Sequence, residues 1–347
     1  MGKQVGIGLV GCGFIAFDAH FPSIAETPEA KLIAVASASA EHARTAAKKY
    51  GAKYWYTEYE KMLKNPEVEV VDICTLNFLH KDEAVAAFEA GKHVICIKPL
   101  ARTLKEADEM LNSARKAGAK LMYAENDMFA PPLVRAKEIV DEGALGKIFR
   151  IHVSEGISRP HAKWFFDREK VGGGALIDMA IHSIGFTRWM VGTEVDRVYA
   201  ELGTYVHKEL MAEDNSVVVM KFKDGVVAVN EDSWSIPSCD SRFEVFGSEG
   251  VVLVDMIRSQ PVLVYSEKGY GYVSEKVALA KGWTFPIAGQ GYRVYGHLDM
   301  MKHFIECIAE DKKPISDGQV GRAALEVVQA AYESARTQAV VKLPLKP

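Results

Sequence analysis

The stretch Val5-Gly-Ile-Gly-Leu-Val-Gly-Cys-Gly-Phe-Ile-Ala16 decides the fold of this chain, because an apolar run breaks there into the pattern Gly11-x-Gly13-x-x-Ala16. In such a turn Gly11 lets the backbone bend sharply after a buried strand, and Gly13 removes the side chain that would hold a pyrophosphate away. Ala16 allows the next helix to lie close to the sheet. The pattern predicts a dinucleotide site, although glycine turns after strands also serve packing alone.

The residues that follow this turn favour the dinucleotide interpretation. Phe14 and Ile15 begin a predicted helix whose free N–H groups would face the phosphates, so we expect both residues at the cofactor. A second apolar strand, residues 31–37, leaves room for one helix after the first strand. The three elements form a strand-helix-strand unit of the length that a dinucleotide site requires.

Apolar runs continue to alternate with helix-like segments through the first part of the chain. The further runs are residues 68–76, 93–97 and 120–124, and the helix-like segments are residues 40–50, 81–90 and 104–117. This order predicts a doubly wound parallel sheet in a first domain over residues 1–128.

Length, composition and charge exclude several classes of protein. A chain of 347 residues suggests two domains of about 150 residues each. A hydrophobic content of 48% is sufficient for a core in both. The net charge of −4 combines mixed acids and bases, with no basic patch for nucleic acid and no polybasic stretch for a membrane surface. We therefore expect neither nucleic acid nor a membrane among the partners.

The cysteines and the start of the chain indicate a cytoplasmic protein. The five cysteines are odd in number, widely spaced and mostly within apolar runs, which is typical of buried thiols in a reducing compartment and not of a metal cluster. The first strand begins so early that we expect no signal peptide, and no apolar run reaches the roughly 18 residues of a membrane span.

The second part of the chain has a different order of predicted strands and helices. After Ala130-Pro131-Pro132 comes an amphipathic segment, then a strand over residues 148–154, and from Val195 onward strand follows strand. The expected strands are residues 195–204, 215–221, 226–234, 242–247, 251–255 and 261–265, and the expected helices are residues 174–191, 297–309 and 319–338. Turn signals between the strands predict a mostly antiparallel open sheet. We expect an α+β domain over residues 129–347 for substrate binding and oligomerisation, with the last helix packing back near the domain junction.

Lys98 is the first residue whose position favours catalysis. It follows the apolar strand 93–97 and precedes Pro99, so it lies at the carboxyl end of a sheet strand, where α/β folds bind ligands. A lysine there can hold or donate the proton of a substrate hydroxyl. Pro99 fixes the following turn, in a cis or a trans form that sequence does not distinguish. The alternative is a solvated lysine at a strand end.

Asp178 and His182 form a second candidate pair. They follow the run Gly172-Gly173-Gly174, and a spacing of four residues predicts that they share one face of a helix. A histidine that takes a hydroxyl proton beside an orienting aspartate suits hydride transfer from an alcohol. The alternative is a surface ion pair, which apolar neighbours disfavour because unpaired charges are costly there. A metal pair lacks a clear third ligand, so we expect no metal.

Four motifs in this order carry a family resemblance across nearly the whole chain. They are Gly11-x-Gly13-x-x-Ala16, Thr75-Leu-Asn77-Phe-Leu-His80, Lys98-Pro99-Leu100-Ala101 and Gly172-Gly-Gly-x-x-x-Asp178-x-x-x-His182. The chain resembles the glucose-fructose oxidoreductase / inositol dehydrogenase / rhizopine-catabolism (Gfo/Idh/MocA) family. The resemblance implies an N-terminal Rossmann domain and a C-terminal sheet that forms a homodimer or homotetramer. It also implies NAD(P)-dependent oxidation or reduction of a ring hydroxyl on a carbohydrate or cyclitol substrate.

The resemblance assigns roles to particular residues. It implies that Lys98, Asp178 and His182 form the catalytic set and also contact the substrate. The residues that it places beside the cofactor are Thr75, Asn77, His80, Lys98 and Pro99.

The chain departs from the family pattern at two positions. Ile97 stands where the family usually has a glutamate before the lysine, so a polar contact to the nicotinamide ribose is missing. Ser37 stands where an aspartate would bind the adenosine ribose. With Ser39, His42 and Arg44 close in sequence, hydroxyl and cationic groups can hold a 2′-phosphate, which favours NADP. The alternative is that Ser37 binds NAD less tightly and Arg44 lies on a solvated helix face.

Substrate contacts are expected from two segments. Residues 158–165 mix stacking and hydrogen-bonding groups that suit sugars, with His161 and Trp164 as the candidates. Glu125 and Asn126 follow the last parallel strand and can bind hydroxyls. Alternatively, Trp164 and Phe165 pack a domain interface. Weaker candidates near the chain's far end are Tyr292, Arg293 and Tyr295.

Three functions fit these observations. The first is a reversible NAD(P)-dependent dehydrogenase or reductase that acts on a sugar, a sugar derivative or a cyclitol. The second is a glycoside-cleaving enzyme that oxidises the ring transiently and retains its cofactor. The third is an NADP(H)-binding sensor without catalysis, which the joint presence of Lys98, Asp178 and His182 disfavours.

Overall fold

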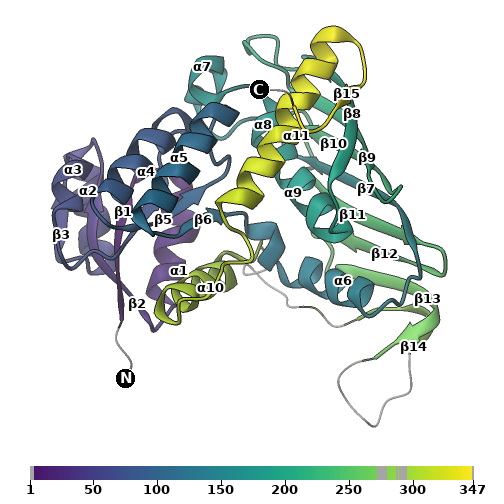
Figure 1. The fold of residues 1–347 in the computed structure, drawn as a ribbon, viewed down its shortest axis with the longest axis horizontal. Helices are drawn as coiled ribbons and strands as arrows, with labels where there is room; N and C mark the ends of the chain where they lie inside the picture. The colour runs from purple at the N-terminus through teal and green to yellow at the C-terminus, as the bar shows by residue number, and fades with distance from the viewer. Residues whose placement is uncertain (1–3, 272–279, 287, 289–294, 346–347) are drawn as a thin grey trace. The chain divides into compact units, whose positions relative to one another are not determined.

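The chain forms two compact units, shown as a ribbon in Figure 1. The computed structural model describes residues 4–271, 280–286, 288 and 295–345. The first unit comprises Met1–Asn126, Lys170–Gly172 and Gly296–Leu325, and the second comprises Asp127–Glu169, Gly173–Tyr295 and Glu326–Pro347. The first unit thus includes two segments that follow the predicted boundary at residue 128.

The first unit contains a six-stranded sheet in the order β3-β2-β1-β4-β5-β6. Its strands are β1 Val5–Val10, β2 Ala30–Ala36, β3 Tyr54–Tyr56, β4 Val70–Ile73, β5 His93–Ile97 and β6 Leu121–Ala124. All neighbouring strands are parallel, which confirms the predicted doubly wound sheet. Every residue of β1 is buried, as expected of a central strand covered on both faces.

Local sequence signals set the limits of the helices in this unit. The helices are α1 Phe21–Ala25, α2 Ala40–Tyr50, α3 Tyr59–Leu63, α4 His80–Glu89, α5 Leu104–Ala117 and α10 His297–Ala309. The Thr103 hydroxyl accepts the Glu106 N–H at the start of α5, and Gly118 ends that helix in the left-handed region with φ of 61°. Although α10 comes late in the chain, it packs against α1.

The second unit contains a nine-stranded sheet in the order β14-β13-β12-β11-β7-β10-β9-β8-β15. Its strands are β7 Ile148–Gly156, β8 Val195–Gly203, β9 Asn215–Phe222, β10 Val227–Ser233, β11 Asp240–Gly247, β12 Gly250–Asp255, β13 Val262–Tyr270, β14 Ala280–Thr284 and β15 Val341–Lys342. Strands β7 and β10 pair in parallel and the other pairs are antiparallel, which confirms the predicted mostly antiparallel sheet.

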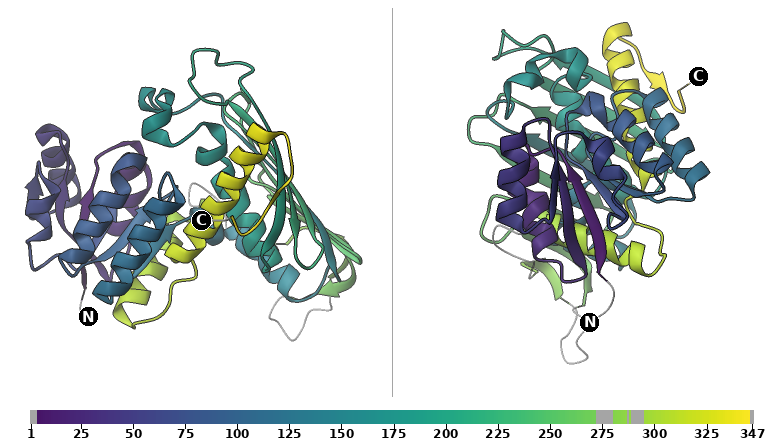
Figure 2. Two further views of the ribbon diagram at one scale, coloured as in Figure 1. Left: turned by 45° about the horizontal axis from the view of Figure 1, so that its top comes forward. Right: turned by 90° about the vertical axis from the view of Figure 1, so that its left-hand side faces the viewer.

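The helices of the second unit are α6 Pro131–Asp141, α7 Arg168–Val171, α8 Ala175–Asp178, α9 Ala180–Val191 and α11 Gly318–Thr337, of which α7 and α11 each extend across the division between units. Three of them, α6, α8 and α9, pack on the sheet of this unit. Helix α9 packs on β7 and β10, and α6 packs on β12 and β13. Figure 2 shows α6, α8 and α9 along one side of the strands. Within the described residues, no helix covers the opposite face.

The predicted single helix over residues 174–191 is wrong, because the chain breaks at Met179. Met179 ends α8 and begins α9, with φ of −96° and ψ of −52°. The His182 N–H then donates to the Met179 carbonyl, three residues back, at 3.0 Å. Asp178 and His182 therefore belong to two consecutive helical segments and not to one continuous helix.

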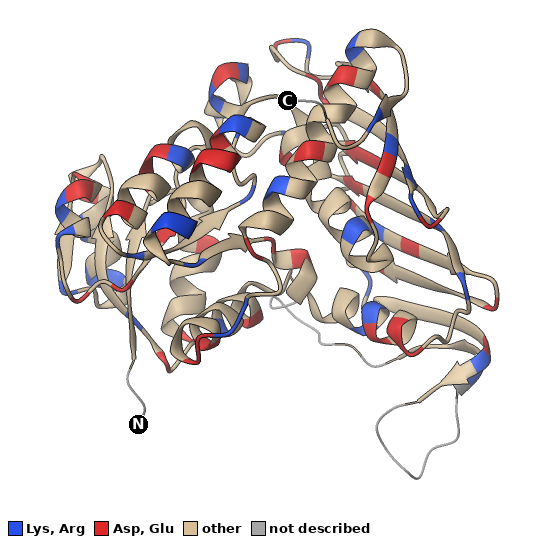
Figure 3. Ribbon diagram, in the orientation of Figure 1, with Lys and Arg blue, Asp and Glu red and all other residues tan. Residues whose placement is uncertain are grey.

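Charged side chains of both signs are mixed over the ribbon. Figure 3 shows Lys and Arg next to Asp and Glu along most of the helices. Among the described residues we find no helix with both the length and the apolar character that crossing a bilayer demands.

Candidate active site

The turn after β1 has the geometry that the glycine pattern predicts. Gly11 has φ of 95°, and a Cβ atom on it would lie 2.6 Å from the Cys74 carbonyl oxygen. Only glycine fits there, because both the backbone angle and the close approach exclude a side chain. A Cβ atom on Gly13 would meet no atom within 4 Å, so this position opens onto free space. The turn therefore fits a dinucleotide pyrophosphate.

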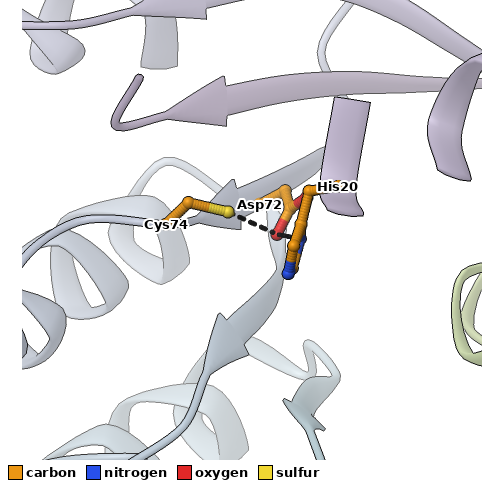
Figure 4. A group of neighbouring side chains, drawn as sticks. All are labelled: His20, Asp72 and Cys74. Atoms are coloured by element: carbon orange, nitrogen blue, oxygen red, sulfur yellow. Dashed lines mark hydrogen bonds and ion pairs between the residues drawn. The ribbon is translucent and has the colours of Figure 1, made fainter. Parts of the chain in front are cut away.

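A buried hydrogen bond between His20 and Asp72 fixes the segment that follows this turn. Residues Ala16–His20 form a π-helical turn that leads into α1. His20 Nδ1 lies 2.8 Å from Asp72 Oδ2, and both side chains are buried (Figure 4). Cys74 Sγ lies 3.7 Å from Asp72 Oδ1. Burial, followed by the charge of Asp72, raises the pKa of the Cys74 thiol well above its usual value. The three side chains form a buried hydrogen-bonded cluster.

The ends of four neighbouring strands bring the candidate residues of the first unit to one edge of its sheet. Gly11 follows β1, Thr75 follows β4, Lys98 follows β5 and Glu125 follows β6, in the spatial order of these strands. Ligands of open α/β sheets bind at this carboxyl edge. Lys98 is half-buried there, Glu125 is fully buried and Asn126, the next residue, is 9% exposed.

His80 ties two of these strand ends together. Its Nδ1 lies 2.9 Å from the Pro99 carbonyl oxygen, and its Nε2 lies 3.3 Å from the Thr75 carbonyl oxygen. The ring is fully buried, and burial lowers its pKa. The Lys98–Pro99 peptide bond is cis. Both ring nitrogens thus contact backbone carbonyls, which gives His80 a positioning role for the loop that carries Lys98.

The two polar side chains between β4 and α4 are also held by the protein. The Thr75 hydroxyl donates to Glu83 Oε2 at 2.5 Å, and Asn77 Nδ2 donates to the Val171 carbonyl at 2.8 Å. Burial raises the pKa of Glu83 to about 7, against the hydrogen bond from Thr75, which lowers it. These contacts fix the backbone of the 75–80 segment.

The residues near Ser37 are engaged in ways that the sequence does not reveal. The Ser39 hydroxyl accepts the His42 N–H at 3.3 Å and thereby caps α2. Ser37 Oγ accepts the Ser39 N–H at 3.3 Å, and it also bonds the Cys12 thiol. The Arg44 guanidinium lies 5.0 Å above the Trp55 ring. Arg44 is therefore stacked on an aromatic ring, whereas His42 is exposed at the start of α2.

In the second unit, a buried tryptophan binds Asp178. Trp234 Nε1 donates to Asp178 Oδ2 at 2.9 Å, and both side chains are buried. The Trp234 ring also meets Phe165 edge-on, with ring centroids 5.9 Å apart. Trp164 stacks on Phe165 at 4.0 Å. Phe165 thus packs on Trp234 and Trp164 stacks on Phe165, while His161 is exposed.

Glu213 holds the start of the helix that ends at Asp178. Its Oε1 accepts the Gly174 N–H at 2.9 Å, the Leu176 N–H at 3.1 Å and the Tyr332 hydroxyl at 2.8 Å. A Cβ atom on Gly174 would lie 2.1 Å from the Glu213 carbonyl oxygen, which explains a glycine at this position. Nothing in the glycine run itself predicts Glu213 as its partner.

His182 lies half-buried on α9, a helix that packs on β10. Asp232 is buried, and its Oδ2 accepts the Ser183 hydroxyl at 3.0 Å. Sequence reasoning missed Asp232 and Trp234, although a charged residue at a core-facing position of a strand is a usable signal. Of the weaker candidates, Tyr295 is exposed, while Tyr292 and Arg293 lie outside the described residues.

Each unit offers groups of the kinds that acid/base chemistry with a nicotinamide cofactor uses. The first unit offers a phosphate-accepting turn and a lysine at the same sheet edge. The second unit offers a carboxylate fixed by Trp234 and an imidazole four residues later. Such groups can take and return the proton of an alcohol while a hydride is exchanged.

Two protein-family models match the chain. One, described as an oxidoreductase family with an NAD-binding Rossmann fold, matches residues 5–125. The other, described as the GFO/IDH/MocA C-terminal domain, matches residues 133–253.

Characterised proteins resemble the chain over nearly its full length. Myo-inositol 2-dehydrogenase of Thermotoga maritima is 29% identical over 341 residues, 97% of this chain and 98% of that protein. A levoglucosan dehydrogenase structure in complex with NADH and levoglucosan has a TM-score of 0.88 and 27% identity, and covers 99% of this chain and 100% of that one. The structure of GenD2 from gentamicin A biosynthesis in complex with NAD has a TM-score of 0.87 and 27% identity, over 99% and 98% of the two chains.

Proposed function

Because the chain belongs to the Gfo/Idh/MocA oxidoreductase family, we propose that it transfers a hydride between a bound nicotinamide and a ring hydroxyl of a sugar, sugar derivative or cyclitol. Its class, an NAD(P)-dependent oxidoreductase, follows from the family. The observation that carries the proposal is Lys98 at the sheet edge that also holds the Gly11 turn. The relatives are named dehydrogenases, so they do not favour a glycoside-cleaving enzyme or a sensor.

The proposed roles follow the chemistry of the three side chains. In the oxidation direction the substrate C–H bond breaks with its electron pair, and the hydroxyl proton passes to His182, so that a ketone forms. The bound nicotinamide supplies the acceptor for the electron pair and hydrogen. The Lys98 ammonium donates a hydrogen bond to the reacting oxygen, and Asp178 accepts one from a substrate hydroxyl. Reduction runs through the same groups in reverse.

We assign the residues that contact the cofactor from the sequence motifs. We place the phosphates at Gly11 and Gly13, with the N–H groups of Phe14 and Ile15 close by, because the free space at Gly13 fits them. Around the nicotinamide we assign the segment from Thr75 through Asn77 and the turn Lys98-Pro99. His80 supports both segments through the backbone.

The coenzyme preference is the finer part of this proposal. The chain binds NAD(P), and we propose a preference for NADP, whose 2′-phosphate would lie at the start of α2 near Ser37, Ser39 and His42. No acidic residue stands at Ser37 to repel it, and free N–H groups at a helix start attract anions. One observation does not favour NADP: the Arg44 guanidinium is stacked on Trp55. The cofactor-free protein is titrated with NADH and with NADPH while nicotinamide fluorescence is recorded. Tighter binding of NADPH would support the proposed NADP preference, and tighter binding of NADH would refute it.

The substrate class rests on the relatives and on the polar groups of both units. Inositol and levoglucosan are cyclic polyhydroxylated molecules, and the named relatives act on or bind them. We propose a substrate of that kind, with Glu125 and Asn126 accepting and donating hydrogen bonds to its hydroxyls. His161 is a further candidate, and Trp164 is the weakest because it stacks on Phe165.

We further propose that the open face of the nine-stranded sheet joins copies of this chain into a homodimer or homotetramer. Apolar side chains on this face include Val217, which is 41% exposed, and Trp283, which is 57% exposed and packs beside Tyr265. Light scattering on the Val217→Lys variant should show a smaller particle than the unaltered protein. The buried free thiols Cys12, Cys74 and Cys96 support a cytoplasmic, reducing location.

Activity measurements on a lysine pair test the proposed function. Reduction of NAD and NADP is followed with a panel of cyclitols and cyclic sugars, for the unaltered protein, Lys98→Ala and the control Lys105→Ala on the exposed surface of α5. We expect turnover with at least one panel member, a loss of about 100-fold or more in Lys98→Ala and none in the control. Equal activity of Lys98→Ala and the unaltered protein would remove Lys98 from the mechanism.

A further inference from the structure

Asp178 lies at the end of a helix that is too short to hold its own place. Helix α8 has four residues, Ala175–Asp178. An isolated helix of this length is not stable in water, and its first N–H groups have no acceptor within the helix. Groups outside α8 therefore have to fix the position of the Asp178 carboxylate.

The residue before this helix does not provide the usual cap. Gly174 occupies the N-cap position, where the side chain of a serine, threonine, asparagine or aspartate commonly accepts an N–H group of the first turn. Glycine has no side chain for this purpose, and the close approach of Glu213 leaves no room for one. The acceptor for the start of α8 therefore comes from another part of the chain.

Glu213, which follows Gly174 by 39 residues, supplies this acceptor. Its carboxyl oxygen Oε1 accepts the N–H groups of Gly174 and Leu176, and its backbone carbonyl accepts the N–H of Ala175 at 2.9 Å. One residue thus binds three successive N–H groups at the start of α8. Glu213 is only 9% exposed, so little water competes for these hydrogen bonds.

Tyr332 of α11 holds the Glu213 carboxylate in this place. Its hydroxyl donates to Glu213 Oε1 at 2.8 Å and accepts the Gly174 N–H at 3.2 Å. A Cβ atom on Gly173 would overlap the same hydroxyl group. The approach of Tyr332 and Glu213 thus explains why two glycines precede α8.

The residue next to Glu213 supports the other end of α8. The Asp214 carbonyl accepts the backbone N–H of Trp234 at 2.8 Å, and the Trp234 indole donates to Asp178 Oδ2 at 2.9 Å. The Asp214 carboxylate accepts the N–H groups of residues 205–207, each at 2.8 Å, so the loop before β9 is itself fixed. Two adjacent residues therefore bind the start of α8 and, through Trp234, the side chain at its end.

We propose that Glu213 is a positioning residue that caps α8 and thereby sets the place of the Asp178 carboxylate, with Tyr332 as its support. The proposal rests on the proposed function, because it assumes that Asp178 binds a substrate hydroxyl. Glu213 and Tyr332 have no assigned contact with the substrate or the coenzyme. A change at either residue should therefore affect the reaction through Asp178.

Steady-state kinetics with a cyclitol or cyclic sugar test this in three variants. Glu213→Ala removes the carboxylate, and the displaced Asp178 should lower kcat/KM for the substrate by about 10- to 100-fold. Glu213→Gln keeps an acceptor oxygen of the same reach and should restore most of that loss. Tyr332→Phe removes only the supporting hydroxyl, so a loss of about 2- to 10-fold is expected, and it carries the kinetic test should Glu213→Ala not fold.

Two comparisons separate positioning from a general loss of structure. The affinity for the coenzyme, which we place in the first unit, should be the same in all three variants as in the unaltered protein. The matched control is Glu209→Gln, in the same loop as Glu213 but with a side chain that is 60% exposed. This control should leave kcat/KM unchanged.

A spectroscopic signal follows Asp178 without substrate or turnover. The chain has five tryptophans, so the indole N–H signal of Trp234 is assigned in nitrogen-15 NMR spectra of the full-length protein with Trp234→Phe. This signal reports the hydrogen bond to Asp178. It should move in Glu213→Ala and, to a smaller extent, in Tyr332→Phe. It should not move further when Glu213→Ala is added to Asp178→Ala, because the carboxylate that transmits the effect is then missing.

The outcomes distinguish the proposal from the function on which it rests. An unmoved Trp234 signal in both Glu213→Ala and Tyr332→Phe would overturn the proposal whether or not the protein is active. Equal losses of kcat/KM in Glu209→Gln and Glu213→Ala would also overturn it. A protein that oxidises no cyclic substrate, but whose Trp234 signal moves as expected, contradicts the proposed function and supports the capping of α8. If Asp178→Ala keeps full dehydrogenase activity, the assigned role of Asp178 fails, and the proposal fails with it.

Discussion

Replacing Trp234 by phenylalanine tests whether a single buried hydrogen bond holds Asp178 ready for reaction. The Nε1–H donates to Asp178 Oδ2 at 2.9 Å, with the tryptophan fully buried and the aspartate 4% exposed. A hydrogen bond to a charged group contributes about 1.5–3 kcal/mol, and the smaller ring adds about 1 kcal/mol for the space it leaves. We therefore expect Trp234→Phe to lower the free energy of unfolding by about 3 kcal/mol.

The same substitution should affect catalysis, because a carboxylate without this donor no longer keeps one orientation. If the whole contribution of the bond serves to orient Asp178, kcat/KM falls by roughly 10- to 150-fold. The control is Trp189→Phe on α9, a half-buried ring that contacts Phe186 edge-on at 6.4 Å. Urea unfolding and steady-state kinetics are measured on both variants. Equal losses in both, or an unchanged kcat/KM in Trp234→Phe, would refute the orienting role.

Three further predictions concern the first unit. Gly11→Ala should abolish NADH binding in a fluorescence titration, because its Cβ would lie 2.6 Å from the Cys74 carbonyl oxygen at φ of 95°, and binding of unchanged strength would contradict the turn geometry. Asp72→Ala should cost about 1–3 kcal/mol in chemical unfolding, since it leaves the buried His20 ring without its hydrogen-bond partner, and an unchanged free energy of unfolding would count against this contact. Because the raised pKa of Glu83, about 7, means that the native state binds its proton more tightly, stability from this group falls as pH rises from 4.5 to about 7. Glu83→Gln should accordingly be more stable than the unaltered protein at pH 8, by about 2 kcal/mol, and equal denaturation midpoints at that pH would contradict this.

Periodicity and turn chemistry were sufficient to predict the two sheets. The strands of the first unit are continuous apolar runs, and parallel strands covered on both faces leave that pattern in any sequence. The later strands alternate and are joined by short polar turns, which is typical of an antiparallel sheet with one open face. Both signals involve residues that are close in sequence, so they can be recognised without knowledge of the tertiary contacts.

The break at Met179 could not be predicted from the sequence, because its causes lie far along the chain. Glu213 accepts two backbone N–H groups at the start of α8, and Trp234 binds the Asp178 side chain at its end. These long-range contacts override the local helix propensity of a segment whose residues suit one continuous helix. The same reason hides Asp232, whose partner Ser183 lies 49 residues away.

The residues near Ser37 show a different limit of sequence reasoning. A hydroxyl and a cation close in sequence predict a phosphate site, but side chains have several possible partners. Ser39 caps α2, and Arg44 stacks on Trp55 instead of pointing along the chain toward Ser37. Which partner a polar side chain selects depends on the neighbouring helix and strand, and that information is absent from the spacing alone.

The most direct test of the account follows the hydrogen itself. A cyclitol or cyclic sugar that the protein oxidises is labelled with deuterium at each ring carbon in turn, and the nicotinamide product is examined by mass spectrometry and NMR. The account predicts that one labelled carbon transfers its deuterium to the nicotinamide ring, and that Lys98→Ala binds the coenzyme but transfers it at least about 100-fold more slowly. Reduced coenzyme without deuterium from any ring carbon would contradict direct hydride transfer from a ring hydroxyl.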